Sequence, residues 1–273
     1  MRELRTRLPT PYVFILWLRS MYWQDGTIEM MMTYLGIAVS YNYGLRSSEY
    51  THDDANKGEQ AIRTGDVFFT GVDGRRYYPW QLSSVTDTEI SSGMLVNVSS
   101  KTLSDGIGRD LFLARGSPVE SQLLDDLLHW SRISGIQQTD IFFARYKDDR
   151  GRMRKKQLTP KMVSAALKDA AILFGLPSTM FSTHCNRIGC ASDLAAYGLH
   201  DDDIKRFIGW KSDASLLYQR GSAGDPSALR AEEIGGTLSI SDVASLVPIS
   251  RSSDLNTAAG KRTRVEGGST LHS

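Results

Sequence analysis

Helical spacing of apolar residues dominates this 273-residue chain, and one block of extended segments interrupts it. Apolar residues recur at helical intervals over 10–23 and 27–43, which predicts two helices before the block. The stretches at 67–72, 94–100 and 110–115 have the character of strands, and an Asp-Gly turn signal separates the last two. This order of elements predicts a mainly α domain with a small antiparallel β-sheet, an α+β fold.

Helical spacing resumes after the extended block, and two of the predicted helices carry start signals. Asp25, Gly26 and Thr27 form a cap region at the start of the second helix. Thr159 and Pro160 give a capping residue followed by a proline at the first helical position, where no N–H is needed. The later predicted helices cover 117–134, 160–174, 184–197, 201–209 and 212–219.

The composition changes beyond Tyr218, where serine, glycine and threonine become frequent. Such a composition is typical of segments without a core of their own. We therefore expect a domain at 1–220 and a flexible tail at 221–273, in which SDVASLVPI at 241–249 forms a short docking helix.

Charge and cysteine content narrow the class of protein. Lysine plus arginine (32) nearly balances aspartate plus glutamate (31), so a charged partner must be met by a local patch. Cys185 and Cys190 do not suffice for a disulfide framework or a four-cysteine zinc site, and we expect both to be small buried residues. The apolar run YVFILWL at 12–18 is too short to span a bilayer and predicts a core helix. We expect an intracellular protein that binds no metal.

Four short fragments, far apart in the chain, form an ordered set. They contain an arginine three residues before a glutamate, a lysine at a hairpin, a His-x-x-Arg pair, and a tryptophan followed shortly by a tyrosine. In this order they resemble the tyrosine recombinase family over roughly residues 25–220. The fragments are GLRSSE (44–49), SSKT (99–102), THCNR (183–187) and IGWKSDASLLY (208–218).

The resemblance implies the fold of a tyrosine-recombinase catalytic domain and a DNA-cleaving activity. In that family a tyrosine oxygen attacks a DNA phosphodiester, leaving a 3′-phosphotyrosyl bond and a free 5′-hydroxyl. Tyr218 matches the nucleophile, and Arg46 and Arg187 match the two arginines that clamp the phosphate. A guanidinium suits this task because its planar fork binds two oxygens and stays charged at any working pH.

The resemblance also assigns the residues around the clamp. His184 lies one helical turn before Arg187, within reach of the same phosphate or of the tyrosine hydroxyl. Trp210 matches a donor of an indole N–H to a phosphoryl oxygen. Lys101 matches the general acid that protonates the leaving 5′-oxygen, and Glu49 is expected to hold Arg46 in orientation.

A basic stretch at 144–157 has seven basic and two acidic residues. We interpret it as a loop that contacts DNA phosphates outside the catalytic centre. Lys147, Lys155 and Lys156 are also the alternatives to Lys101 as general acid. The residues expected to bind DNA are Arg145, Lys147, Arg150, Arg152, Arg154, Lys155 and Lys156.

The resemblance implies double-stranded DNA as partner, self-association on DNA, no cofactor, and a nuclear location if the source is eukaryotic. The stretch at 195–220 is also similar to recombinases of eukaryotic mobile elements. Because Arg46 falls early, we expect the family's complete N-terminal DNA-clamping domain to be missing, and residues 51–66 have no assigned role. Two alternatives stay open, a type IB topoisomerase-like enzyme and a catalytically inactive DNA-binding remnant.

Overall fold

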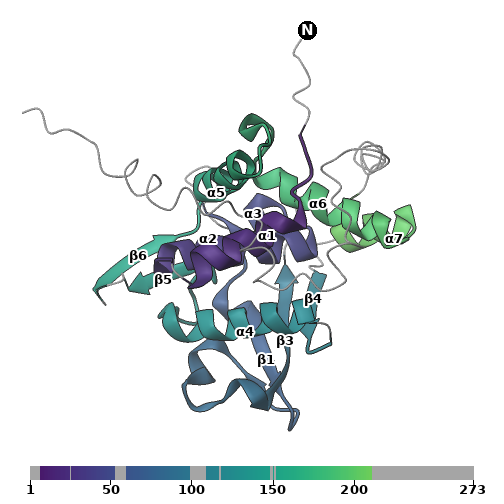
Figure 1. The fold of residues 1–273 in the computed structure, drawn as a ribbon. Coiled ribbons are helices and arrows are strands. Elements are labelled where there is room, and N and C mark those ends of the chain that lie inside the picture. Colours follow the sequence, from purple (N-terminus) through teal and green to yellow (C-terminus); the bar gives the residue numbers. More distant parts are fainter. Residues whose placement is uncertain are drawn as a thin grey trace, which may run out of the picture.

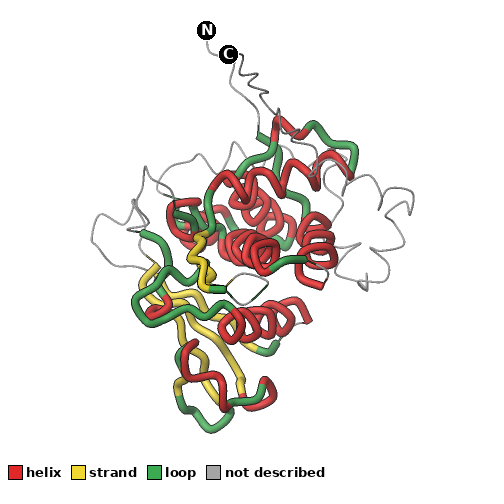
Figure 2. The backbone as a smooth tube through the Cα atoms, turned by 90° about the vertical axis from the view of Figure 1, so that its left-hand side faces the viewer, coloured by secondary structure: helices red, strands yellow, loops and turns green. Residues whose placement is uncertain are grey.

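The structure is a computed structural model, which describes residues 7–210 except 25, 53–59, 99–108, 117, 148–149 and 151. Helices predominate in this part of the chain, and a small antiparallel sheet accompanies them, so the predicted α+β class is confirmed. Most helices gather in one half of the molecule, while the sheet and helix α4 form the other half (Figures 1 and 2). The predicted helices at 212–219 and 241–249 lie outside the described residues.

The helices begin and end close to the predicted positions. Thr27 caps the second helix by accepting a hydrogen bond from the Met30 N–H at 3.3 Å. Thr159 caps another by accepting from the Met162 N–H at 3.3 Å, with proline at the first position, as predicted. The helices are α1 (Tyr12–Leu18), α2 (Ile28–Tyr43), α3 (Ser47–Tyr50), α4 (Pro118–Ile133), α5 (Pro160–Leu173), α6 (Thr183–Ala196) and α7 (Asp201–Ile208).

The first predicted helix is split in two. α1 buries five of its seven residues, which confirms a core helix, but the chain then widens into a π-helix at Arg19–Gln24. There the Arg19 guanidinium makes two 3.0 Å bonds to the buried carboxylate of Asp126 on α4. The Tyr34 hydroxyl of α2 donates to the same carboxylate at 2.8 Å. This buried network joins three helices across the two halves of the molecule. In the described residues, no helix is long and apolar enough to cross a membrane.

The main sheet has the strand order β2-β1-β3-β4, and all its pairs are antiparallel. α4 lies against this sheet (Figure 1), and it approaches closely at Gly93, where an added Cβ would lie 3.1 Å from Leu124 of that helix. The short β2 was not predicted. The strands of this sheet are β1 (Val67–Gly71), β2 (Arg76–Tyr77), β3 (Ile90–Val98) and β4 (Arg109–Ala114).

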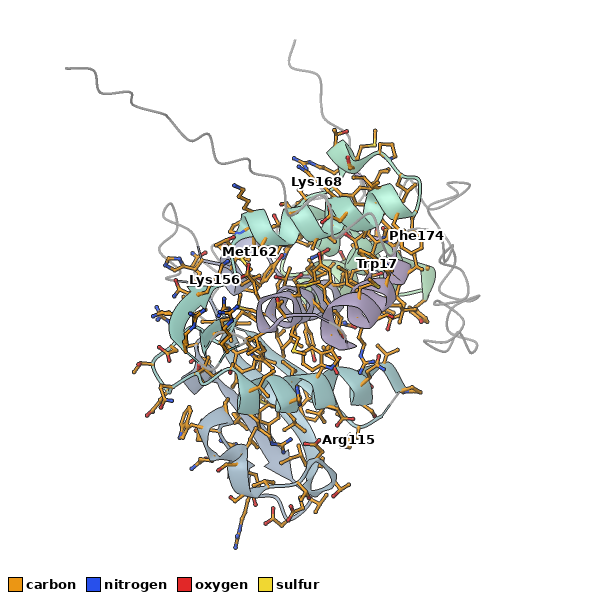
Figure 3. All side chains as sticks on the ribbon, turned by 60° about the vertical axis from the view of Figure 1, so that its left-hand side comes forward. Trp17, Arg115, Lys156, Met162, Lys168 and Phe174 are labelled. Carbon is orange, nitrogen blue, oxygen red and sulfur yellow. The ribbon has the colours of Figure 1, made fainter. Side chains whose placement is uncertain are left out.

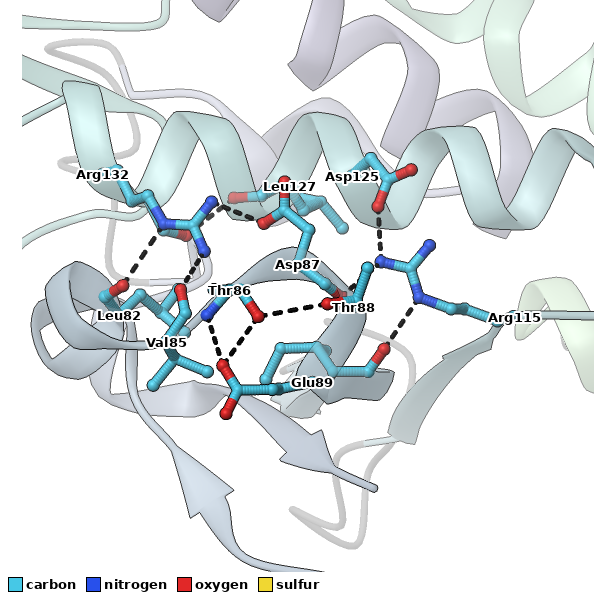
Figure 4. Close-up of polar contacts among 12 residues, drawn as sticks. Leu82, Val85, Thr86, Asp87, Thr88, Glu89, Arg115, Asp125, Leu127 and Arg132 are labelled. Carbon is cyan, nitrogen blue, oxygen red and sulfur yellow. Dashed lines mark hydrogen bonds and ion pairs between the residues drawn. The ribbon is translucent and has the colours of Figure 1, made fainter. Parts of the chain in front are cut away.

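Two arginines fasten α4 to the connection that precedes β3 (Figure 4). The Arg132 guanidinium donates to the Asp87 carboxylate at 2.5 Å and to the Val85 carbonyl at 2.7 Å. At the other end, Arg115 donates to the Asp125 carboxylate of α4 at 2.5 Å and to the Ile90 carbonyl at 2.7 Å. The sheet and its helix are thereby held as one unit.

The interpretation of residues 144–157 as a loop is wrong, because they form a two-stranded antiparallel hairpin of β5 (Ala144–Lys147) and β6 (Met153–Gln157). The stretch is rich in basic residues and lacks the alternation of apolar residues from which a strand is predicted. The buried Phe142 and Phe143 lead into the hairpin, and the buried Leu158 leads out of it. The Leu158 N–H donates to the Phe143 carbonyl at 2.9 Å, so apolar anchors close the base while the basic residues lie beyond it.

Residues 60–66, for which the sequence suggested no role, link the two halves of the molecule. The Ile62 N–H donates to the Glu49 carbonyl at 2.9 Å, and the Ile62 carbonyl accepts from the Phe142 N–H at 2.9 Å. The Thr64 backbone N–H donates to the Asp140 carbonyl at 2.8 Å. This segment therefore carries the chain from α3 to the start of β1.

α6 lies against α2 through a close and partly polar contact. Gly189 of α6 allows the approach, because a Cβ there would come within 2.6 Å of the Tyr41 ring. The Tyr41 hydroxyl donates a short hydrogen bond to the Asp193 carboxylate. Burial raises the pKa of Asp193 to about 6, and the hydrogen bond from Tyr41 opposes that shift only in part.

Replacing Asp193 by asparagine is expected to remove a pH-dependent loss of stability. An unfolded aspartate has a pKa of about 3.9, so the folded state of the parent binds the proton more tightly. The free energy of unfolding should therefore fall by about 1–3 kcal/mol as pH rises from about 4 to about 6. Urea unfolding of parent and Asp193→Asn across this range would measure the difference.

The exposed Asp203 supplies the matched control, because Asp203→Asn should keep the decline of the parent. An Asp193→Asn variant with the same decline would contradict the assignment.

Candidate active site

Arg46 stands in the short connection between α2 and α3. α2 ends at Gly44 in the left-handed conformation, with φ at 57°, which glycine adopts without a Cβ clash. The Arg46 backbone N–H donates to the Glu49 carboxylate at 2.8 Å, and its guanidinium contacts the same carboxylate at 3.3 Å. Glu49 is fully buried. The carboxylate therefore supports the guanidinium from the protein side.

Arg187 lies in the second turn of α6, and only 1% of its surface is exposed. Its guanidinium donates to the Gly44 carbonyl at 2.6 Å and to the Ile208 carbonyl at 2.8 Å. A buried guanidinium is costly unless its N–H groups find acceptors, and the carbonyl groups supply them. Arg187 thus joins the end of α2 to the end of α7.

The two guanidinium groups meet at the carbonyl oxygen of Gly209. Arg46 donates to this oxygen at 3.0 Å and Arg187 at 3.5 Å. Gly209 ends α7 in the left-handed conformation, with φ at 74°. The next residue, Trp210, lies against Arg187, with its ring centroid 5.3 Å from the guanidinium carbon. Arg46 therefore meets a point that Arg187 also reaches, although Arg46 lies 163 residues before Gly209 in the chain.

His184 lies in the first turn of α6, the helix that carries Arg187, and its side chain is exposed to solvent. Partial burial lowers the pKa of His184, and the positive charges of Arg187, Arg7 and Arg46 lower it further. Both effects disfavour the charged imidazolium and favour the neutral imidazole.

Two residues of this region were missed by the sequence reasoning, Asn186 and Thr10. Asn186 is completely buried, although it stands between the two residues of the His-x-x-Arg pair. Its side chain accepts from the Thr10 hydroxyl at 3.0 Å and donates to the Ser40 hydroxyl at 2.7 Å. The sequence feature that could have indicated Asn186 is a polar residue at a position of the predicted helix that faces the core. The feature that could have indicated Thr10 is that a proline stands on each side of it.

Lys101 and Tyr218 lie outside the described residues, so their predicted roles stay predictions. The described residues bring together Arg46, His184, Arg187 and Trp210, with Glu49 behind Arg46.

The basic residues of the β5–β6 hairpin fall into two groups. Arg145 is nearly buried and contacts Glu29 on the first turn of α2 at 3.4 Å, and Lys156 contacts the same carboxylate at 2.6 Å. These contacts fasten the hairpin to α2, and Figure 3 labels Lys156 on the hairpin. Arg150, Arg152 and Lys155 are exposed, as is Lys156 despite its contact with Glu29, while Lys147 and Arg154 lie on the strands.

The cysteines and the other possible ligands form no metal centre in the described residues. Cys185 and Cys190 are buried, as predicted. No group of three or more His, Cys, Asp or Glu side chains in this part of the chain is arranged to hold an ion.

Comparison with known proteins gives little beyond this geometry. No protein-family model matches the chain, and no curated protein matches it. Among solved structures, the crystal structure of XerA recombinase is similar at 15% sequence identity and a TM-score of 0.43. The match covers 88% of this chain and 66% of that chain, slightly under two thirds of its length. The activity must therefore be argued from the site itself.

Replacing Arg187 by lysine is expected to destabilise the protein by about 2–4 kcal/mol. A single ammonium cannot reach the Gly44 and Ile208 carbonyl groups in the geometry of the fork, so at least one buried acceptor loses its donor. Denaturant unfolding would measure the loss.

Arg206→Lys is the matched control, because Arg206 is exposed and its ion pair with Asp203 is a surface pair. It should change stability by less than about 0.5 kcal/mol. Equal stability of Arg187→Lys and the parent would contradict the bridging role of Arg187.

Proposed function

We propose that this chain cuts and rejoins double-stranded DNA through a covalent 3′-phosphotyrosyl intermediate at Tyr218. One observation carries the proposal, the convergence of the Arg46 and Arg187 guanidinium groups on the Gly209 carbonyl beside Trp210. Two like charges held together in this way form a site for an anion with several oxygens. A DNA phosphodiester is such an anion.

The chemistry needs charge stabilisation that exists before the reaction begins. Attack on phosphorus places extra negative charge on the non-bridging oxygens, and donors fixed in advance stabilise it without reorganisation. The Glu49 carboxylate and the carbonyl groups of Gly44, Ile208 and Gly209 fix both guanidinium groups. In this proposal Trp210 adds its indole N–H as a further donor.

The proposed cleavage step includes two proton transfers, one from the attacking tyrosine and one to the leaving oxygen. Tyr218 loses its hydroxyl proton as its oxygen bonds to phosphorus, and the neutral His184 is suited to receive it. The bond from phosphorus to the 5′-oxygen breaks, and Lys101 gives that oxygen a proton. Rejoining runs the same steps backwards, with the 5′-hydroxyl as nucleophile.

The strand register supports the assignment of Lys101. The start of β1 pairs with the later part of β3, at Val67 and Leu95. β1 follows the segment in which Ile62 bonds to the Glu49 carbonyl, so this end of the sheet is the one nearer to Arg46. β3 and β4 remain paired up to Val98 and Arg109. The connection that contains Lys101 therefore begins and ends on the side of the arginines.

The β5–β6 hairpin supplies a second type of DNA contact in this proposal. Arg150, Arg152 and Lys155 are exposed, and such residues bind backbone phosphates without regard to sequence. Glu29 holds the base of the hairpin through Arg145 and Lys156. The chain would thereby contact DNA beyond the reacting phosphate.

Trapping on a nicked suicide substrate tests the proposal directly, because loss of the short 5′-fragment prevents rejoining and leaves the adduct. Tyr218→Phe should abolish the covalent protein–DNA adduct and leave DNA affinity nearly unchanged, since it removes only the attacking oxygen. Denaturing electrophoresis measures the adduct, and fluorescence anisotropy measures binding.

Adduct formation by Tyr218→Phe would assign the nucleophile elsewhere. Binding without any adduct by the parent would favour an inactive remnant. If adduct forms, product analysis separates two activities. Relaxed circles alone indicate a topoisomerase, and joined or excised segments indicate a recombinase.

Lys101→Ala is expected to slow cleavage of ordinary DNA by a factor on the order of 10²–10⁴, the range typical of a lost general acid. Sulfur in place of the bridging 5′-oxygen gives a leaving group that departs as a thiolate without a proton. On that substrate Lys101→Ala should cleave almost as fast as the parent. Single-turnover rates on both substrates make the comparison.

Arg46→Ala is the control for this experiment, because charge on the non-bridging oxygens still needs stabilisation when sulfur is present. It should stay defective on both substrates. A Lys101→Ala variant that is equally slow on both would make Lys101 a binding residue, with Lys147, Lys155 and Lys156 as the next candidates for the acid.

A further inference from the structure

The segment that precedes α1 is attached to the candidate site. The Thr10 backbone N–H donates to the Cys185 carbonyl at 3.0 Å, and its hydroxyl donates to Asn186 at 3.0 Å. Both acceptors lie in the turn of α6 that separates His184 from Arg187. Gly189 makes room for this contact, because a Cβ there would lie 2.4 Å from the Thr10 carbonyl oxygen.

Two prolines stiffen this segment. Leu8 and Thr10 each precede a proline, which restricts both to extended backbone. Pro11 has φ at −70° and ψ at 144°, an extended conformation in which the ring fixes φ. Leu8 packs against the hydrophobic core. The backbone of residues Leu8–Pro11, called the strap below, is therefore fixed in an extended conformation against α6.

Arg7 immediately precedes the strap and is partly buried. Three residues span at most about 11 Å, so the anchor at Thr10 keeps Arg7 close to the start of α6. Burial and the charge of Arg187 lower the pKa of His184, and the charge of Arg7 adds to that shift. Burial raises the pKa of Cys185, and the charge of Arg7 opposes that rise, which agrees with this position. Among the residues that the structure describes, no carboxylate forms an ion pair with Arg7. A third cation therefore stands beside an already positive site.

We propose that Arg7 is a DNA-binding residue, which contacts a backbone phosphate on the His184 side of the site. The inference rests on the proposed function in taking double-stranded DNA as ligand. Arg7 adds a phosphate contact next to the one held by Arg46 and Arg187. The strap fixes the backbone next to Arg7 in advance, so little backbone freedom is lost on binding.

The salt dependence of DNA binding tests this contact without requiring chemistry. We would measure affinity for a fluorescein-labelled duplex of mixed sequence by anisotropy, between about 50 and 200 mM salt. All variants would carry Tyr218→Phe, so that no adduct forms. The slope of log K against log salt is negative, and Arg7→Gln should reduce its magnitude by about 0.9, while Arg7→Lys should restore it.

Arg75→Gln is the matched control, because Arg75 is exposed and lies between β1 and β2 of the main sheet. It should keep the full slope. Thr10→Val preserves shape but removes the anchoring hydroxyl, and it should weaken binding by a smaller factor than Arg7→Gln. The double variant should bind no more weakly than Arg7→Gln alone, because both changes remove one contact.

The outcomes separate this inference from the proposed function. A folded Arg7→Gln variant with an unchanged slope would overturn the Arg7 contact, even if the parent forms an adduct. Fully additive losses in the double variant would overturn the positioning role of the strap. A parent that binds DNA but forms no adduct would overturn the cleavage proposal, and a reduced slope in Arg7→Gln would still support the contact.

Discussion

The candidate site depends on one shared acceptor, the carbonyl oxygen of Gly209. Two guanidinium groups repel each other, so their proximity requires an acceptor between them and a counter-charge behind them. Arg46 and Arg187 both donate to this oxygen, and Glu49 supplies the negative charge. The left-handed conformation of Gly209 ends α7 and turns the chain into Trp210. A residue with a Cβ at this position would strain the turn that brings the acceptor and the tryptophan together.

The helices α2 and α6 form the frame that holds this acceptor in place. Arg187 bonds to the carbonyl of Gly44 at the end of α2, while Asn186 bonds to Ser40 one turn earlier. Tyr41 and Asp193 extend the contact further along both helices. The polar groups of this contact are partly or fully buried, so losing one partner would leave the other without compensation. The packing that stabilises the fold therefore also fixes the separation of Arg46 and Arg187.

Local sequence signals predicted the helices well, because periodicity, Thr27, Thr159 and Pro160 act within a few residues. They predicted the residues of the candidate site only as an ordered set. What they missed depends on partners far away in the chain. The β5–β6 hairpin reads as a basic loop because the apolar residues that close it lie outside the basic stretch, and Arg145 meets its partner Glu29 116 residues away. No local pattern shows that Asn186 has Thr10 as a partner.

The same dependence on distant partners explains how the candidate site is attached to the sheet half of the molecule. Arg46 and Arg187 belong to the helical half, and the chain reaches the sheet within a few contacts of Arg46. The Tyr43 hydroxyl at the end of α2 donates to the Phe112 carbonyl of β4 at 2.9 Å, and Ile62 joins the segment before β1 to Glu49. These contacts attach the sheet within three residues of Arg46 on either side. A shift of the sheet relative to α2 would therefore change the distance between the sheet and Arg46. The position of the sheet and the position of this guanidinium are linked through these two contacts.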